Sequence, residues 1–136
     1  MKIILTNDES ENYFYNALCN GLHYMGGYGL QLQWDENEYD RAKGKWEYEH
    51  KGKDPIVSPQ ACYEDILMQI LKDGGTLTMV DLENGEDDKV ITLDDVHKRV
   101  QTTPLRHLMN MVNEEDDAET ADVILQTVFY QDVIFG

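Results

Sequence analysis

Apolar residues recur every three or four positions in five stretches of the chain, which is the spacing of one face of an α-helix. The pattern predicts helices over residues 10–24, 58–72, 92–100, 103–112 and 118–130. Three glycines, at positions 26, 27 and 29, end the first helix. The predicted caps of the five helices are, in order, Asp8 (with Glu11), Ser58, Thr92, Thr103, and Asp116 or Asp117.

Between the helices, short apolar or alternating runs predict β-strands. Residues 3–5 form a buried run, residues 30–34 alternate between apolar and polar, and Trp46 and Tyr48 alternate with glutamates. Residues 76–82 and 89–92 flank Asn84-Gly85, a strong hairpin signal. Because acidic residues crowd this turn and repel each other, we expect a loop longer than two residues.

Through Leu82 the order of these elements is β-α-β-β-α-β, which is the order of the ferredoxin-like split βαβ motif. The predicted fold class is therefore α+β, with a ferredoxin-like sheet, an added β-hairpin strand and C-terminal helices. We expect a single domain over residues 1–136, with a sheet-and-helix core at 1–82 and a hairpin strand plus helical extension at 83–136. The helix at 118–130 is apolar nearly all round, which predicts burial on several sides, and residues 133–135 form a final strand or a docked tail.

Charge changes this picture most, since 27 acidic and 11 basic residues give a formal charge of −16. Nucleic acid and anionic membranes attract basic surfaces, so direct binding to either is disfavoured. The apolar run at the N-terminus is too short for a signal peptide, and no stretch approaches the length of a membrane span. We expect a cytoplasmic protein, with Cys19 and Cys62 as reduced cysteines of the core.

Motifs for catalysis and for metals are weak. The acidic loops that begin at Asp81 and Asn113 lack the glycine that a calcium loop needs at its turn. Asp94 and His97 share one predicted helix face, which His107 could approach, but no further metal-ligand spacing supports them. We therefore predict no cofactor, no metal and no catalytic residue, and an enzyme is the less favoured class. The aromatic residues Tyr24, Tyr28, Trp34, Trp46 and Tyr48 are interpreted as core, with a protein-contact patch as the alternative.

The acidity is concentrated between residues 81 and 122, which hold thirteen acids and four bases. One interpretation of this charge is a solvated surface that keeps the protein soluble. The other is that carboxylates on rigid helices and a hairpin present a negative field that selects partners with a basic surface. Proteins that bind nucleic acid have such surfaces, and they are the expected kind of partner. The predicted partner-binding residues are Glu83, Glu86, Asp87, Asp88, Asp94, Asp95, Glu114, Glu115, Asp116, Asp117 and Glu119.

The C-terminal residues 113–126 and 132–136 resemble the ends of some small, acidic, uncharacterised accessory proteins of bacteriophages and mobile elements. This resemblance implies a protein that acts in the host cytoplasm. Some members of that class inhibit their targets as DNA mimics.

The leading hypothesis is therefore a non-enzymatic protein that binds a basic protein surface, with DNA mimicry as its most specific form. Two alternatives stay open. One is a ligand-binding protein or enzyme with a pocket between the sheet and the C-terminal helices, which would use His97 and His107. The other is a structural or assembly subunit that forms homo-oligomers.

Overall fold

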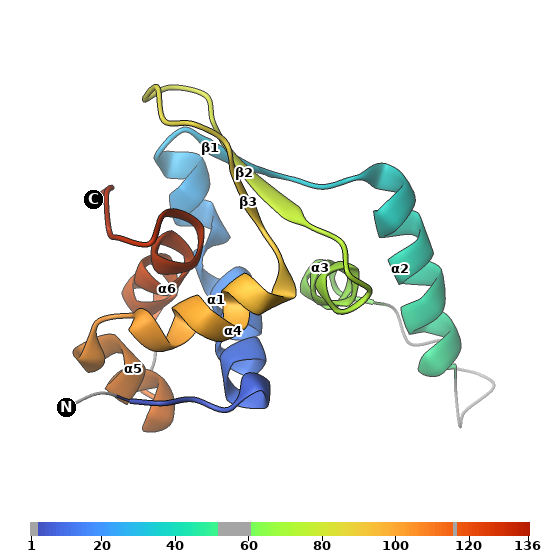
Figure 1. Ribbon diagram of the computed structural model, residues 1–136, viewed down its shortest axis with the longest axis horizontal. Coiled ribbons are helices and arrows are strands. Elements are labelled where there is room, and N and C mark those ends of the chain that lie inside the picture. Colours follow the sequence, from blue (N-terminus) through green and yellow to red (C-terminus); the bar gives the residue numbers. More distant parts are fainter. Residues whose placement is uncertain (1–2, 52–60, 116) are drawn as a thin grey trace.

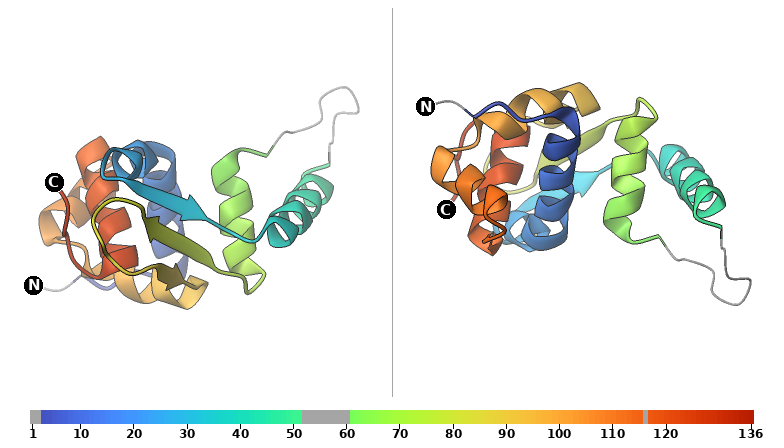
Figure 2. Two further views of the ribbon diagram at one scale, coloured as in Figure 1. Left: turned by 90° about the horizontal axis from the view of Figure 1, so that it is seen from above. Right: turned by 90° about the horizontal axis from the view of Figure 1, so that it is seen from below.

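The computed structural model describes residues 3–51, 61–115 and 117–136, and it shows an α+β protein (Figure 1). In chain order the elements are α1 (Asn7–Gly27), β1 (Leu30–Gln33), α2 (Glu36–Glu49), α3 (Tyr63–Lys72), β2 (Leu77–Asp81), β3 (Lys89–Ile91), α4 (Leu93–Arg99), the 3₁₀ helix η1 (Val100–Thr102), α5 (Leu105–Val112) and α6 (Ala118–Tyr130). The three strands form one antiparallel sheet in the order β1-β2-β3. Figure 2 shows α1 and α6 packed together on one side, with α2 and α3 projecting away from them.

The sheet has one buried and one solvated face, as the alternating pattern of an antiparallel sheet requires. Leu77 pairs with Ile91 across β2 and β3, and both side chains are fully buried. On the other face Gln31 and Val90 are exposed. The predicted hairpin is confirmed, and its loop is longer than two residues because pairing begins only at Lys89.

Helix α6 lies at the centre of the core and packs along α1. Its residues 120–129 are all buried, because α1, α4, α5 and β3 surround it. The predictions of a helix at 118–130 and of burial on several sides are confirmed. The apolar surface that suggested oligomerisation is therefore covered within the chain, and residues 83–136 contribute to the main core.

The C-terminal tail is docked and forms no strand. Gln126, which is fully buried in α6, accepts hydrogen bonds from the backbone N–H groups of Ile134 and Phe135, both at 2.9 Å. The ring of Phe135 stacks on Tyr28, with 5.4 Å between the ring centroids. The docked-tail prediction is thus confirmed.

Two predicted strands are wrong, and the ferredoxin-like order is not confirmed. Residues 3–5 pair with no strand, since the Leu5 N–H donates to the side chain of Gln101 instead. Trp46 and Tyr48 lie in helix α2, which Asp35 caps by accepting from the N–H groups of Asn37 and Glu38. A two-residue alternation was too short a signal to outweigh this cap and the helical spacing of the residues after it.

The remaining helices lie close to their predicted positions. Helix α4 and its N-cap are both confirmed, since Thr92 and Asp95 form a capping box. Helix α1 begins earlier than predicted, since its capping box is formed by Thr6 and Glu9. Its end requires only one of the three glycines in the left-handed conformation, Gly29, whose φ is 80°. The predicted Ser58 cap lies outside the described residues, but the helix predicted from residue 58 begins later, since Cys62 is the N-cap of α3.

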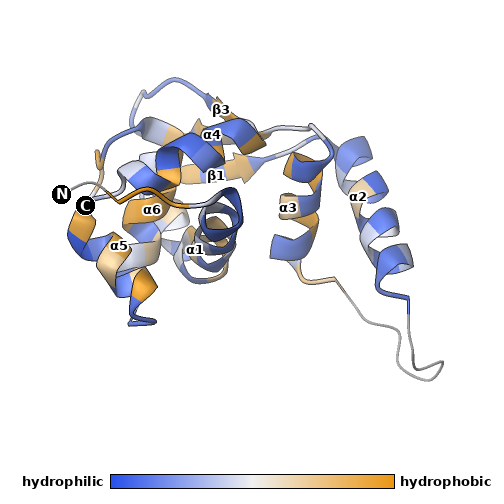
Figure 3. Cartoon of the chain, turned by 60° about the horizontal axis from the view of Figure 1, so that its bottom comes forward, coloured by the Kyte–Doolittle hydropathy of each residue, from blue (hydrophilic) through white to orange (hydrophobic). Residues whose placement is uncertain are grey.

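Helix α5 exists where predicted but turns a different face to the core. The pattern places Leu105, Leu108, Met109 and Val112 inward, but only Leu108 is buried and the other three are exposed. Also buried are Met111 and His107, whose Nδ1 lies 2.9 Å from the Thr120 hydroxyl on α6. This buried hydrogen bond helps to fix the rotation of the helix, because breaking it would leave Nδ1 of the buried His107 unpaired. Figure 3 shows apolar residues on the exposed side of α5.

Candidate functional site

A cleft of about 430 Å³ opens between α1, α2 and α3. In the described part of the chain, four carboxylates, three aromatic rings, one lysine and three other side chains line it. The charged and aromatic lining residues are Asp8, Glu11 and Tyr15 of α1, Trp46 and Glu49 of α2 with His50 directly after it, and Asp65 and Lys72 of α3. A space of this size admits one or two side chains of another molecule.

Two of the four carboxylates are already bound within the chain. Glu11 lies 2.9 Å from Nε2 of His97 and 3.8 Å from the ammonium group of Lys72. Asp65 accepts a hydrogen bond from the backbone N–H of Cys62. Asp8 and Glu49 are exposed on opposite walls and, among the described residues, form no ion pair. The cleft therefore has carboxylates available for an external cation.

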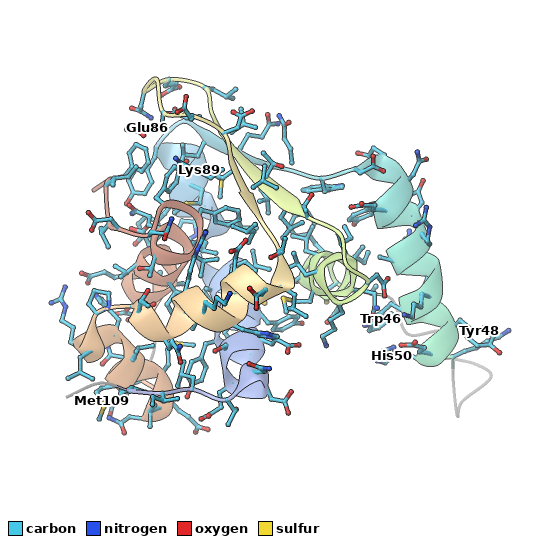
Figure 4. The ribbon with its side chains drawn as sticks, in the orientation of Figure 1. Trp46, Tyr48, His50, Glu86, Lys89 and Met109 are labelled. Carbon is cyan, nitrogen blue, oxygen red and sulfur yellow. The ribbon has the colours of Figure 1, made fainter. Side chains whose placement is uncertain are left out.

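Beside these carboxylates lies a pair of stacked rings. The centroids of Trp46 and His50 are 4.0 Å apart and the ring planes are inclined by 15°. Nδ1 of His50 is 2.8 Å from the carbonyl oxygen of Trp46. Because a carbonyl oxygen only accepts, Nδ1 carries a proton, and the Nε2 of a neutral His50 is left as an acceptor. Figure 4 shows both rings pointing from α2 towards α3, whereas Tyr48 points away.

The backbone adds to the negative potential of the cleft. A helix C-terminus carries partial negative charge, and basic side chains usually compensate it. The last turn of α2 has no basic residue and holds Glu47 and Glu49 instead. This arrangement is unfavourable for the helix alone, and a cation bound beside Glu49 would relieve it.

Helix α2 is held in place mainly by contacts with α3. Nζ of Lys45 lies 2.8 Å from Oδ1 of Asp73, the residue that ends α3. Gln69 donates to the same oxygen, also at 2.8 Å. At the other end of α2, Trp34 stacks on Tyr39 and meets Tyr63 of α3 edge-on. These contacts set the width of the cleft.

Acidification is expected to loosen α2 from α3. Burial works to raise the pKa of Asp73, but the bonds from Lys45 and Gln69 outweigh it and hold this pKa below its usual value. The contribution of this carboxylate to stability is therefore complete above about pH 4 and is lost as the pH falls through its folded-state pKa. We expect Asp73→Asn to lower the free energy of unfolding by about 0.5 kcal/mol at neutral pH. At a pH below the folded-state pKa of Asp73 the same substitution is expected to change it by almost nothing. Urea unfolding at the two pH values measures the difference. An equal cost at both pH values would exclude the ion pair as the cause.

The β2–β3 loop carries four of the predicted partner-binding carboxylates. They are exposed, and they are Glu83, Glu86, Asp87 and Asp88. Asp81 holds the loop by accepting hydrogen bonds from the backbone N–H groups of Glu83, Asn84 and Glu86. The loop is thus an ordered acidic surface near the C-terminal end of α6 (Figure 1).

The other predicted partner-binding residues lie elsewhere and are partly used inside the chain. Asp94 pairs with Lys98, Asp95 with Arg99, and Glu119 with Arg106, at 2.7, 3.3 and 3.5 Å. Asp117 caps α6, Glu114 and Glu115 are exposed after α5, and Asp116 lies outside the described residues. Since the α5–α6 connection and the β2–β3 loop lie at opposite ends of α6 (Figure 1), the structure does not gather the predicted residues on one surface.

The two predicted histidines are engaged separately. His97 pairs with Glu11 of α1, while the buried His107 pairs with Thr120 of α6. Within residues 3–51, 61–115 and 117–136, no three His, Cys, Asp or Glu side chains are placed to hold a metal ion. The cleft described above lies between α1, α2 and α3, away from the position expected for an enzymatic pocket.

The cysteines are not core residues, which corrects the sequence-based expectation. Cys19 and Cys62 are both free and exposed. Cys62 occupies the N-cap of α3, and Cys19 lies on the outer side of α1 because Ala17 and Leu18 take the inward positions. Partial burial, followed by the neighbouring Glu64 and Asp65, raises the pKa of Cys19, which disfavours its thiolate.

Sequence reasoning missed the cleft because it placed Trp46 in a strand. Trp46 and His50 are four residues apart, a spacing that brings side chains together only on a helix. Of the predicted aromatic set, Tyr24, Tyr28 and Trp34 do pack against the core, whereas Tyr48 is 77% exposed. The signal that predicts this pairing of Trp46 and His50 is Asp35, a residue type that favours the N-cap of a helix.

No family model matches this chain, and none of the curated proteins or solved structures compared with it matches. In the described part of the chain, every helix is too short or too polar to cross a membrane.

Proposed function

We propose that this chain is a non-enzymatic binding protein that takes a basic segment of a partner protein into the cleft between α1, α2 and α3. One observation carries the proposal: among the residues that the structure describes, four carboxylates line the cleft against a single lysine. Asp8 and Glu49 have no ion pair among the described residues, so they offer their charge to an external lysine or arginine.

The surrounding charge supports the same kind of partner. With a formal charge of −16, the chain attracts basic surfaces and accelerates their association. The β2–β3 loop provides a second acidic region that steers such a partner. A protein that binds nucleic acid fits this description, and DNA mimicry by a phage-encoded inhibitor is the most specific form of the proposal. A DNA mimic needs carboxylates in a row, whereas the cleft alone is sufficient for a basic segment.

Binding of a short fluorescein-labelled peptide of alternating arginine and serine, followed by fluorescence anisotropy at low salt, tests the proposal. The double variant Asp8→Asn, Glu49→Gln is expected to bind about tenfold more weakly, since two exposed charge pairs of about 0.7 kcal/mol each are lost together. The matched control is Asp40→Asn, Glu47→Gln. It removes the same two charges from exposed positions of α2 outside the cleft lining.

Equal losses in the two double variants would show that the peptide responds only to net charge, and would overturn the proposal. A third protein, Asp87→Lys with Asp88→Lys, separates the cleft from the loop. If this variant lost affinity while the cleft variant kept it, the site would be the β2–β3 loop. Binding that did not weaken in high salt would contradict both locations.

A further inference from the structure

We infer that the cleft selects the guanidinium group of arginine over the ammonium group of lysine. This inference rests on the proposed function and deepens it, because it names the chemical group that the cleft recognises. It is carried by the stacked rings of Trp46 and His50 next to the carboxylate of Glu49.

The rings of Trp46 and His50 lie face to face, with 4.0 Å between their centroids and 15° between their planes, so they form a rigid two-layer stack with flat outer faces. The hydrogen bond from Nδ1 of His50 to the carbonyl oxygen of Trp46 fixes this stack to the helix. A guanidinium group is planar and weakly hydrated, and it stacks on aromatic faces. An ammonium group is compact and strongly hydrated, and it has no face to stack.

Hydrogen-bond acceptors lie around the stacked rings. Glu49 lies beside His50, and Asp8 lies on the opposite wall, so acceptors approach the centre from two sides. The Nε2 of a neutral His50 is a further acceptor. Five N–H donors in a fixed fork satisfy several carboxylate and imidazole acceptors at once, whereas an ammonium group has only three donors.

Among the described residues, one cation lines the cleft. Lys72 is 3.8 Å from Glu11, which also pairs with His97. Glu11 is thus occupied by side chains of α3 and α4. The incoming group is directed to the α2 side of the cleft, where Glu49, Trp46 and His50 lie.

The test compares two labelled peptides that differ only in arginine or lysine at every basic position. Wild-type protein is expected to bind the arginine peptide about tenfold more tightly, since one stacking contact on an aromatic face is worth about that factor. In Trp46→Leu the arginine preference is expected to fall to about twofold, the part that the hydrogen-bond acceptors supply, whereas Trp46→Phe keeps more of it. The control Tyr48→Leu changes an exposed ring on the far side of the same helix and leaves the preference intact.

Equal affinity of wild-type protein for the two peptides would overturn the inference, as would an unchanged arginine preference in Trp46→Leu. Circular dichroism of each variant shows whether the helices are still folded. If Trp46→Leu has lost helical structure, Trp46→Phe is the decisive variant. If both peptides bind equally but still depend on Asp8 and Glu49, only the arginine preference is refuted.

Discussion

Phe129→Ala is expected to lower the free energy of unfolding by about 3–5 kcal/mol, which is the cost of deleting a buried aromatic ring. Phe129 lies in α6, is 1% exposed and meets Phe14 of α1 with 6.3 Å between the ring centroids. Since α6 is enclosed on several sides, its neighbours have little freedom to collapse into the space left by the ring. Urea unfolding followed by circular dichroism measures the loss.

The control is Val112→Ala on α5, an apolar residue that is 48% exposed. This change is expected to alter stability by less than about 0.5 kcal/mol. A cost for Phe129→Ala as small as that of the control would contradict the placement of α6 at the centre of the core. A cost for Val112→Ala as large as that of Phe129→Ala would show that the exposed face of α5 is covered in solution.

Gly21→Val is expected to destabilise the protein by about 3 kcal/mol, the upper end of the usual cost of overpacking. A Cβ atom at Gly21 would lie 3.0 Å from the backbone carbon and the Cβ of Ala121, and 3.0 Å from a methyl group of Leu125. The first contact is with backbone, which cannot turn aside as a side chain can. The substitution must therefore push α1 and α6 apart along their interface, which urea unfolding detects.

Gly44→Ala is the matched glycine control, because it lies inside α2 with nothing within 4 Å of an added Cβ. This change is expected to raise the free energy of unfolding by about 0.5–1 kcal/mol, since alanine favours a helix more than glycine does. Opposite signs at the two positions would confirm the close α1–α6 approach. Stabilisation by Gly21→Val would disprove it.

Some elements could be predicted because their signals are local. Residues 118–130 combine a cap with a long apolar run, and α4 starts at a capping box, so each helix is specified by adjacent residues. The β2–β3 hairpin is specified in the same way by Asn84-Gly85 between two runs of β-formers. Helix α2 was missed because most of its residues are polar, so the strand-like alternation of Trp46 and Tyr48 was given too much weight.

The candidate site could not be predicted from local patterns. Its lining residues come from residues 8–15, 46–50 and 65–72, which are far apart in the chain and meet only because α2 and α1 both pack on α3. The predicted acidic residues followed charge density along the sequence instead. The structure distributes that charge over both ends of α6 and uses part of it in caps and ion pairs.

The amino-acid sequence alone determined the charge of −16, the positions of most helices and the hairpin, because composition, caps and periodicity act between near neighbours. The tertiary structure decided which face of α5 is buried, that both cysteines are exposed, and which side chains line the cleft. The physical reason is that burial depends on which helices meet. Asp8 and Glu49 line one cleft only because α1 and α2 both pack on α3.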